Sequence, residues 1–120
     1  MIRVDTNYIV RYFVNDNIEM ADIAEEILTN KIVFISHEVL AEVIYVLMGV
    51  YSISKDEIAD MLIELIAFEN INTLDDDVTI RSFKMFKEKN IDFVDCLLCA
   101  YSDRDTIKTF DKKLLKCIQS

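Results

Sequence analysis

The chain has 120 residues, of which 52% are hydrophobic, and carries a formal net charge of −9 with one Gly and no Pro. This size and composition predict one folded domain over residues 1–120 and exclude a disordered chain. No apolar run reaches the roughly 18 residues of a membrane span, and Asp5 interrupts the apolar start of a signal peptide, so we expect a cytoplasmic protein without membrane contact.

The charge is unevenly distributed along the chain. Residues 1–80 hold 4 Lys and Arg against 16 Asp and Glu, whereas residues 81–120 hold 9 against 6. The overall acidity disfavours nucleic-acid binding, but the basic last third can place a cationic surface beside an acidic pocket. The same lysines are equally compatible with an ordinary solvated surface.

Short apolar runs alternate with helical patterns along the chain. The expected strands cover residues 1–4, 32–35, 71–74 and 106–110, because they are β-branched or alternate in polarity. Apolar residues at helical spacing predict helices over about 7–14, 20–28, 37–50, 54–68, 78–89, 90–100 and 114–118. This alternation predicts an α/β domain with a parallel sheet covered by helices.

The three cysteines do not suggest a disulfide or a metal site. Cys96 and Cys99 have the spacing of a CxxC motif, but they lie within an apolar helical pattern without a second pair. We interpret both as small buried residues, and nothing in the sequence requires Cys117 to be bonded.

Five acids stand at positions that carry the functional argument. Asp5 and Asp111 each follow a predicted strand, and ligands of parallel sheets bind at the carboxyl ends of the strands. Asp92 and Asp95 are three residues apart near the start of an apolar helix, so they share one face. Glu42 lies within an apolar helical segment. We therefore expect these acids to meet in one pocket.

Each acid also has a purely structural interpretation. Asp5, Asp92, Asp95 and Asp111 are suitable helix caps. Glu42 can form a salt bridge with Arg3 or Arg11. Taken one at a time these alternatives are preferable, and only the combination of the acids favours a shared site.

Carboxylates that crowd together need protons or a cation. Without Cys or His ligands the site is all oxygen, which favours Mg²⁺ or Mn²⁺ over zinc. Such ions activate water and polarise phosphodiesters, so the expected reaction is hydrolysis of nucleic acid. His37, the only histidine, is interpreted as a surface or capping residue and not as the general base.

Four segments give the sequence a family resemblance. They are Ile-Arg-Val-Asp-Thr-Asn at 2–7, Val-Leu-Ala-Glu-Val-Ile-Tyr-Val-Leu at 39–47, Asp-Phe-Val-Asp-Cys-Leu at 92–97 and Thr-Phe-Asp-Lys-Lys-Leu at 109–114. In this order they resemble a PIN domain, and more narrowly the VapC-type toxin ribonucleases. The resemblance implies a Rossmann-like three-layer α/β/α fold with a short, mostly parallel sheet.

The resemblance also implies a site and partners. It assigns the catalytic and metal-binding acids to Asp5, Glu42, Asp95 and Asp111, with Asp92 as a less certain ligand of Mg²⁺ or Mn²⁺. Asn7 and Thr109 match supporting polar positions. The implied substrate is RNA, and the implied partners are a second copy of the chain and a cognate antitoxin that blocks the acidic pocket.

Two other functions are compatible with the sequence. A noncatalytic module on a PIN-like scaffold would bind RNA or protein without turnover, although such a module would be expected to have lost one of the acids. A phosphoacceptor domain also uses acids at strand ends, and Lys112 could serve as its lysine. That function requires an acid pair after the first strand, whereas Asp5 is single.

Overall fold

The computed structural model covers residues 1–120 and contains one short parallel sheet. β1 (Ile2–Arg3) pairs with β2 (Val33–Phe34), which pairs with β3 (Ile71–Asn72), so the order is β1-β2-β3. Both pairings are parallel, as the alternation of strands and helices predicted. The sheet leaves β1 at one edge.

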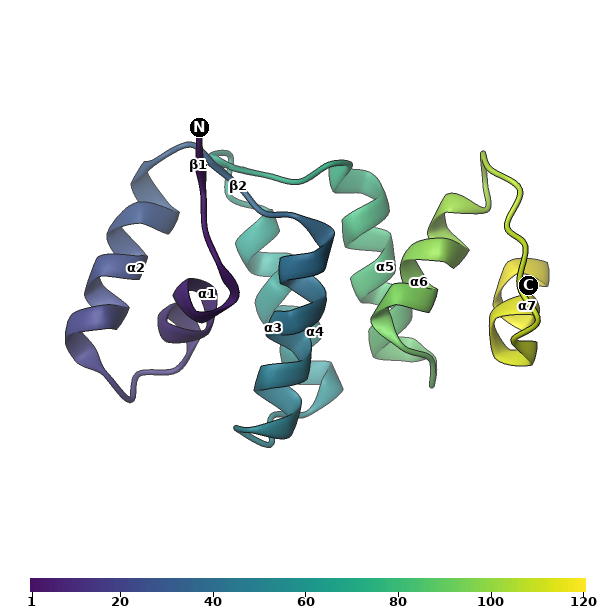
Figure 1. The fold of residues 1–120 in the computed structure, drawn as a ribbon, viewed down its shortest axis with the longest axis horizontal. Coiled ribbons are helices and arrows are strands. Elements are labelled where there is room, and N and C mark those ends of the chain that lie inside the picture. The colour runs from purple at the N-terminus through teal and green to yellow at the C-terminus, as the bar shows by residue number, and fades with distance from the viewer.

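Seven helices complete the mixed α/β domain (Figure 1). They are α1 (Thr6–Phe13), α2 (Ile18–Asn30), α3 (His37–Gly49), α4 (Lys55–Ile66), α5 (Asp76–Glu88), α6 (Phe93–Tyr101) and α7 (Lys112–Gln119). In Figure 1 the strands lie near the top and the helices descend from them, with α1 and α2 at one end and α7 at the other. None of these helices combines the length and the apolar character that crossing a membrane requires.

Short polar side chains set where most helices begin. Ser54 accepts from the backbone amide of Glu57 at the start of α4, and Asp75 accepts from that of Val78 at the start of α5. These bonds satisfy amides that have no partner within the helix. The two side chains thus fix where α4 and α5 begin.

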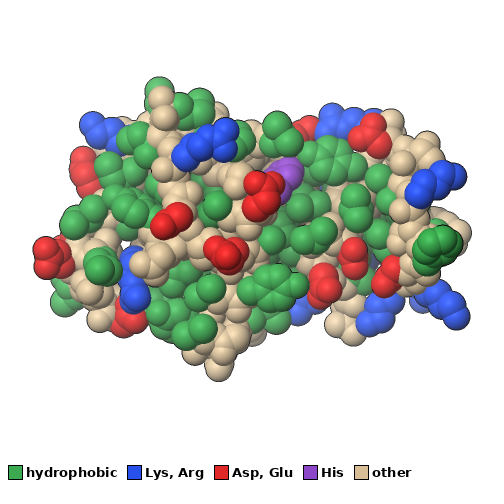
Figure 2. Space-filling view, in the orientation of Figure 1, with side chains coloured by type: hydrophobic (Ala, Val, Ile, Leu, Met, Phe, Trp, Pro, Cys, Tyr) green, Lys and Arg blue, Asp and Glu red, His purple; other side chains and the backbone are tan.

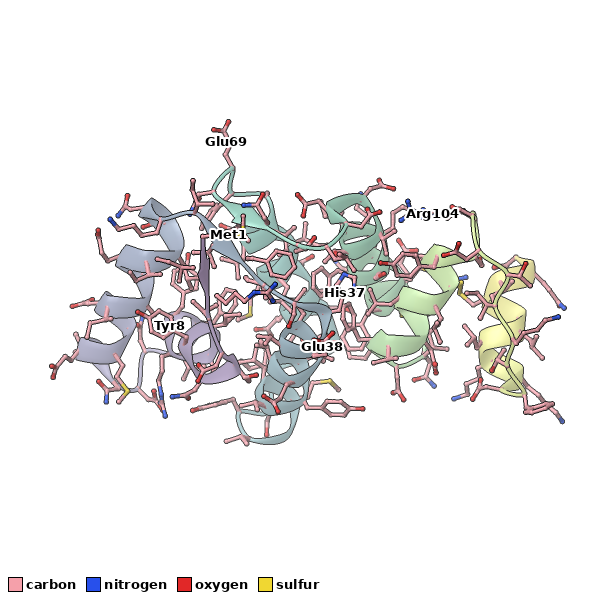
Figure 3. All side chains as sticks on the ribbon, turned by 45° about the horizontal axis from the view of Figure 1, so that its top comes forward. Met1, Tyr8, His37, Glu38, Glu69 and Arg104 are labelled. Carbon is pink, nitrogen blue, oxygen red and sulfur yellow. A yellow bond between two sulfur atoms is a disulfide. The ribbon has the colours of Figure 1, made fainter.

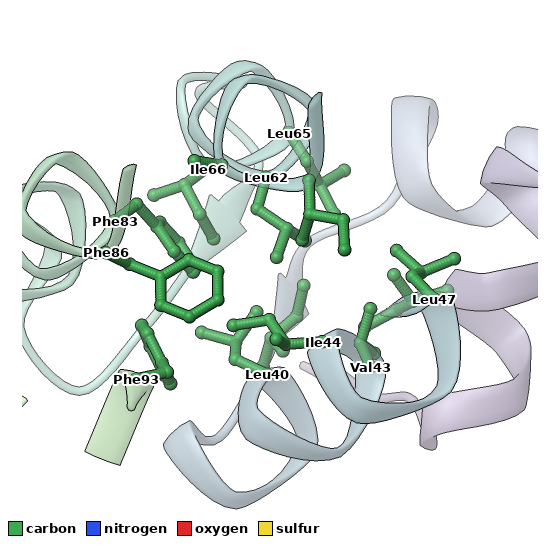
Figure 4. Packing of buried hydrophobic residues seen from close by; sticks show 14 of the residues in the cluster. Leu40, Val43, Ile44, Leu47, Leu62, Leu65, Ile66, Phe83, Phe86 and Phe93 are labelled. Atoms are coloured by element: carbon green, nitrogen blue, oxygen red, sulfur yellow. The ribbon is translucent and has the colours of Figure 1, made fainter. Parts of the chain in front are cut away.

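The core lies where the central helices converge beneath the sheet. Figure 4 shows side chains of α3 and α4 packed against the aromatic residues of α5 and α6. Phe83 and Phe93 stack with ring centroids 4.9 Å apart, and Phe86 meets Phe93 edge-on. Truncating one such buried aromatic side chain to Ala typically costs about 3–5 kcal/mol. This rigid centre separates α1 from α6 and α7.

The expected strand at 106–110 is not formed. The segment has no regular secondary structure and makes no backbone hydrogen bond; Ile107 packs against the cluster of Cys99, Leu114 and Cys117, and Phe110 is fully exposed. Alternating polarity makes a segment suitable for a strand, but a strand also requires a neighbouring edge within reach. Here the following helix packs on α6, at the far end from β1, so the segment has no edge beside it.

A disulfide between Cys99 and Cys117 joins α6 to α7, which corrects the expectation that no cysteine is bonded. The two residues are 18 apart in sequence, and local patterns gave no sign that α7 would fold back on α6. Leu114 is buried beside them. Cys96 is a free buried thiol, as predicted, and burial raises its pKa to about 12.

Candidate functional site

Asp5 and Glu42 belong to one group of polar side chains at the start of α1. Asp5 follows β1 and caps α1, accepting through Oδ1 from the backbone amide of Tyr8 at 3.0 Å. The buried hydroxyl of Thr6 donates to Oε1 of Glu42, which stands in the middle of α3. We call Asp5, Thr6 and Glu42 the Asp5 group. Its contacts fix both carboxylates near the end of β1.

The alternative explanation of Glu42 as half of a salt bridge does not hold. Arg11 pairs with Asp16 at 2.5 Å, and Arg3 lies over the Phe34 ring, 4.4 Å from its centroid. Glu42 itself is exposed and has no cationic partner. Its only side-chain hydrogen bond comes from Thr6, so Oε2 is free to bind a ligand.

A second group of acids gathers where α6 and α7 begin. Asp111 caps α7, accepting from the amide of Leu114 at 2.9 Å. Asp92 stands at the N-cap of α6 but makes no capping hydrogen bond, and Asp95 follows in the first turn. Burial, together with the charges of Asp111 and Asp92, raises the pKa of Asp95 above its ordinary value. We call Asp92, Asp95 and Asp111 the Asp95 group.

The Asp95 group opens into a cavity of about 800 Å³. The opposite wall is formed by one face of α3 that includes Tyr45 and Met48, both of them exposed. Lys112 and Lys113, at the start of α7, also line the cavity. The cavity therefore combines an apolar wall with carboxylates and ammonium groups, and Glu42 lies outside it.

The two groups do not meet within one chain. α3 and α6 lie between Asp5, at the start of α1, and Asp111, at the start of α7 (Figure 1). Nowhere do three or more Asp, Glu, His or Cys side chains come close enough to hold a metal ion. Figure 2 shows the acidic side chains on this face as separate groups with hydrophobic side chains between them.

The donor chemistry suits a hard divalent cation, but the arrangement does not complete a set of ligands. Carboxylate oxygens are the ligands that Mg²⁺ and Mn²⁺ prefer. Burial and the neighbouring charges of Asp111 and Asp92 raise the pKa of Asp95, and a bound cation would favour the charged form of this carboxylate. A single chain, however, offers only Asp92, Asp95 and Asp111 on one side and Asp5 with Glu42 on the other.

His37 lies partly at the surface (Figure 2), but it does not cap α3. It is half-buried at the start of α3, near the middle of the molecule (Figure 3), and Ser36 provides the cap. Nε2 lies 3.0 Å from Oγ1 of Thr79. Burial lowers the pKa of His37, although the charges of Glu38 and Asp75 oppose this shift. The imidazole is therefore a neutral structural contact between α3 and α5.

Supporting polar residues are only partly where the sequence suggested. Thr109 accepts from the amide of Asp111 through Oγ1 at 3.0 Å, so it does orient this acid, whereas Asn7 is exposed. Thr6 was not singled out from the sequence, although it holds Glu42. The only sequence feature that could have identified Thr6 is its hydroxyl, next to the candidate ligand Asp5 at the end of a predicted strand.

A comparison with protein families gives one match. The PIN domain model matches residues 2–117, which is nearly the whole chain. No curated protein matches the sequence. PIN domains are generally nucleases that act on nucleic acid and use divalent metal ions. With a match of this extent and a short parallel sheet surrounded by helices, the chain belongs to the PIN domain family.

Proposed function

We propose that this PIN domain is a metal-dependent endoribonuclease that hydrolyses RNA phosphodiester bonds and serves as the cytoplasmic toxin of a toxin–antitoxin pair. The observation that carries the proposal is that Asp92, Asp95 and Asp111 line one cavity, where burial and then the charges of Asp111 and Asp92 raise the pKa of Asp95. Like charges held together in a cavity are relieved by a cation, and a hard divalent ion is the cation that carboxylates select.

The roles of the individual side chains follow from their free oxygens. Asp5 and Asp111 each accept a capping hydrogen bond through Oδ1. This bond fixes the orientation of the carboxylate, so that the other oxygen, Oδ2, points in one direction. Glu42 is oriented by Thr6 and keeps Oε2 free. Asp95 accepts no hydrogen bond through its side chain, and burial with the charges of Asp111 and Asp92 raises its pKa. When bound, Mg²⁺ or Mn²⁺ would supply Lewis-acid activation of the attacking water and the scissile phosphate.

The basic residues beside the cavity provide contacts for the substrate backbone. Lys112 and Lys113 line the same cavity as Asp95 and Asp111. Their ammonium groups suit RNA phosphates next to the carboxylates, and this interaction would weaken with salt.

The same acidic cavity with its exposed apolar wall suits a cognate antitoxin whose basic and apolar side chains block access.

Activity measurements on purified protein test the proposal. Cleavage of RNA should require Mg²⁺ or Mn²⁺ and stop on chelation. Asp5→Asn, Glu42→Gln, Asp95→Asn and Asp111→Asn should each lower the cleavage rate by about 1,000-fold, equivalent to about 4 kcal/mol of transition-state stabilisation, with the fold retained. Asp22→Asn, an exposed acid of α2, is the matched control and should cleave normally.

A noncatalytic RNA- or protein-binding module is the second candidate. The observation that favours it is that no three acids of a single chain come close enough together to hold a metal ion. Such a module would bind RNA equally with and without divalent ions, and cleavage would be undetectable in the wild type. Cleavage that persists undiminished in both Asp5→Asn and Asp95→Asn would reject the proposed site.

A further inference from the structure

One wall of the cavity beside the Asp95 group carries an aromatic side chain that makes few contacts within the protein. Tyr45, on α3, is 67% exposed and lines this cavity. The only tyrosine hydroxyl with a hydrogen-bond partner is that of Tyr51, and the ring of Tyr45 neither pairs with another aromatic ring nor lies under a cation. The ring is therefore available to a ligand that enters the cavity.

Tyr45 stands between two small residues on one face of α3. Ala41 and Gly49 lie four residues before and after it, and all three line the cavity. Residues four apart share a helix face, so the neighbours of the ring along this face are a methyl group and a bare backbone. Met48, which is also exposed, completes the apolar wall. A flat group can thus lie against the ring without displacing a side chain of these two neighbours.

Gly49 is the only glycine of the chain, and its backbone does not require one. It belongs to α3, it does not have a positive φ, and a methyl group at this position would meet no atom within 4 Å. Glycine in a helix is less favourable than alanine, because it loses more conformational freedom on folding. The missing side chain instead leaves space in the cavity, one turn from Tyr45.

The cavity combines the contacts that a nucleotide requires. A nucleotide joins a flat aromatic base to an anionic phosphate. The ring of Tyr45 suits the base, and the ammonium groups of Lys112 and Lys113 suit the phosphates beside Asp95 and Asp111. A base can stack on a protein side chain only when it is not already stacked and paired within a double helix. The arrangement therefore favours unpaired nucleotides.

We propose that an unpaired base of the RNA substrate stacks on Tyr45, in the space beside Gly49, and that this protein therefore selects single-stranded RNA. The selective cleavage of such RNA rests on the proposed nuclease function, whereas its binding does not. Every base has an aromatic face, so stacking on Tyr45 selects unpaired nucleotides and not a particular sequence.

RNA binding by the inactive Asp95→Asn protein tests the stacking without cleavage. The probe is a short single-stranded RNA that carries a fluorescent base analogue, whose emission should be quenched on binding. Adding Tyr45→Ala should weaken binding about tenfold and abolish the quenching, whereas Tyr45→Phe keeps the ring and should change neither. Val50→Ala alters an exposed residue at the end of α3, outside the cavity, and is the matched control.

Two results of this measurement would overturn the proposal. One is an affinity for the single-stranded probe that Tyr45→Ala leaves unchanged. The other is equal affinity for the probe and for its fully paired duplex, since the paired bases cannot reach the ring.

Filling the space beside the ring tests the role of Gly49 with a change that should not harm the fold. Gly49→Leu replaces a helix-disfavouring residue, so its unfolding midpoint in denaturant should equal or exceed that of the wild type. Its affinity for the single-stranded probe should nevertheless fall about tenfold, because the leucine side chain occupies the place of the base. Full affinity in this stable variant would contradict the proposed position of the base.

Cleavage measurements separate this proposal from the nuclease function. Tyr45→Ala should lower kcat/KM for single-stranded RNA about tenfold. Cleavage at the wild-type rate by Tyr45→Ala would overturn the stacking and leave the nuclease function intact. A wild type that binds RNA through Tyr45 but never cleaves it would overturn the nuclease function and support the stacking. If Tyr45→Ala instead halved the mass in solution and bound RNA normally, the ring would belong to a contact between two copies, which would overturn the proposal.

Discussion

The two acidic groups differ in how their charges are satisfied. In the Asp5 group the carboxylates are oriented by hydrogen bonds, from the amide of Tyr8 to Asp5 and from the hydroxyl of Thr6 to Glu42. In the Asp95 group, Asp92 lacks its capping bond and the pKa of Asp95 is raised by burial and by neighbouring acids. One group is therefore held in fixed orientations by hydrogen bonds, and the other is a concentration of negative charge.

The groups also differ in what holds them in place. The Asp5 group is attached to the sheet and the central core through β1 and α3. Asp111 depends on α7, whose burial rests on a separate small cluster and on one disulfide. Removing that attachment should affect the Asp95 group and leave the Asp5 group unchanged.

Breaking the disulfide should have the largest effect on stability. We expect the Cys99→Ser, Cys117→Ser double variant to lose about 3 kcal/mol of unfolding free energy, because the bond closes a loop of 18 residues. Denaturant unfolding measures the loss, and a reducing agent should destabilise the wild type equally while leaving the variant unaffected. If the wild type, unfolded without a reducing agent, showed three reactive thiols, the Cys99–Cys117 disulfide would be contradicted.

Removing the Thr6 hydroxyl should have an intermediate effect. Thr6→Val leaves Glu42 without its donor, so we expect a loss of about 1 kcal/mol in stability and about a tenfold slower cleavage of RNA. Thr6→Ser keeps a hydroxyl and should restore the rate. Thr29→Val removes a hydroxyl that bonds only to the backbone of α2 and should cleave normally. Unchanged cleavage by Thr6→Val would show that Glu42 needs no orientation.

Neutralising Asp95 should have the smallest effect on stability, and it should stabilise the fold instead of weakening it. A carboxyl whose pKa is raised in the folded protein favours folding when it is protonated, and this contribution is lost as the pH rises through the folded pKa. Without divalent ions at neutral pH, Asp95→Asn should therefore be more stable by at most about 0.5 kcal/mol, since solvent reaches the cavity. The difference should shrink in acid. A less stable variant at neutral pH would contradict the crowding of charge.

Much of the fold follows from local patterns. The three paired strands and the seven helices lie close to their predicted positions, because β-branched runs, helical spacing and caps such as Ser54 and Asp75 act over a few residues. The segment 106–110 has equally clear alternation but no edge beside it. Whether such a segment pairs depends on where α7 packs, which local patterns do not encode.

The site was harder to predict than the fold. Sequence reasoning placed Asp5 beside Asp111 because both follow expected strands, whereas Asp111 shares a cavity with Asp95. The contact between Thr6 and Glu42 joins residues 36 apart and left no sequence signal beyond their chemistry. The joint role of Asp5, Glu42, Asp95 and Asp111 stays a prediction.

The central claim is that all four acids take part in binding divalent metal, and iron-mediated backbone cleavage tests it most directly. Fe²⁺ replaces Mg²⁺ in all-oxygen sites, and with ascorbate and peroxide it cuts the polypeptide next to the bound ion. We predict cuts around residues 5, 42, 95 and 111 of the wild type, which excess Mg²⁺ suppresses and which Asp95→Asn abolishes. Cuts confined to the segments of one acidic group, or no cuts at all, would contradict the account.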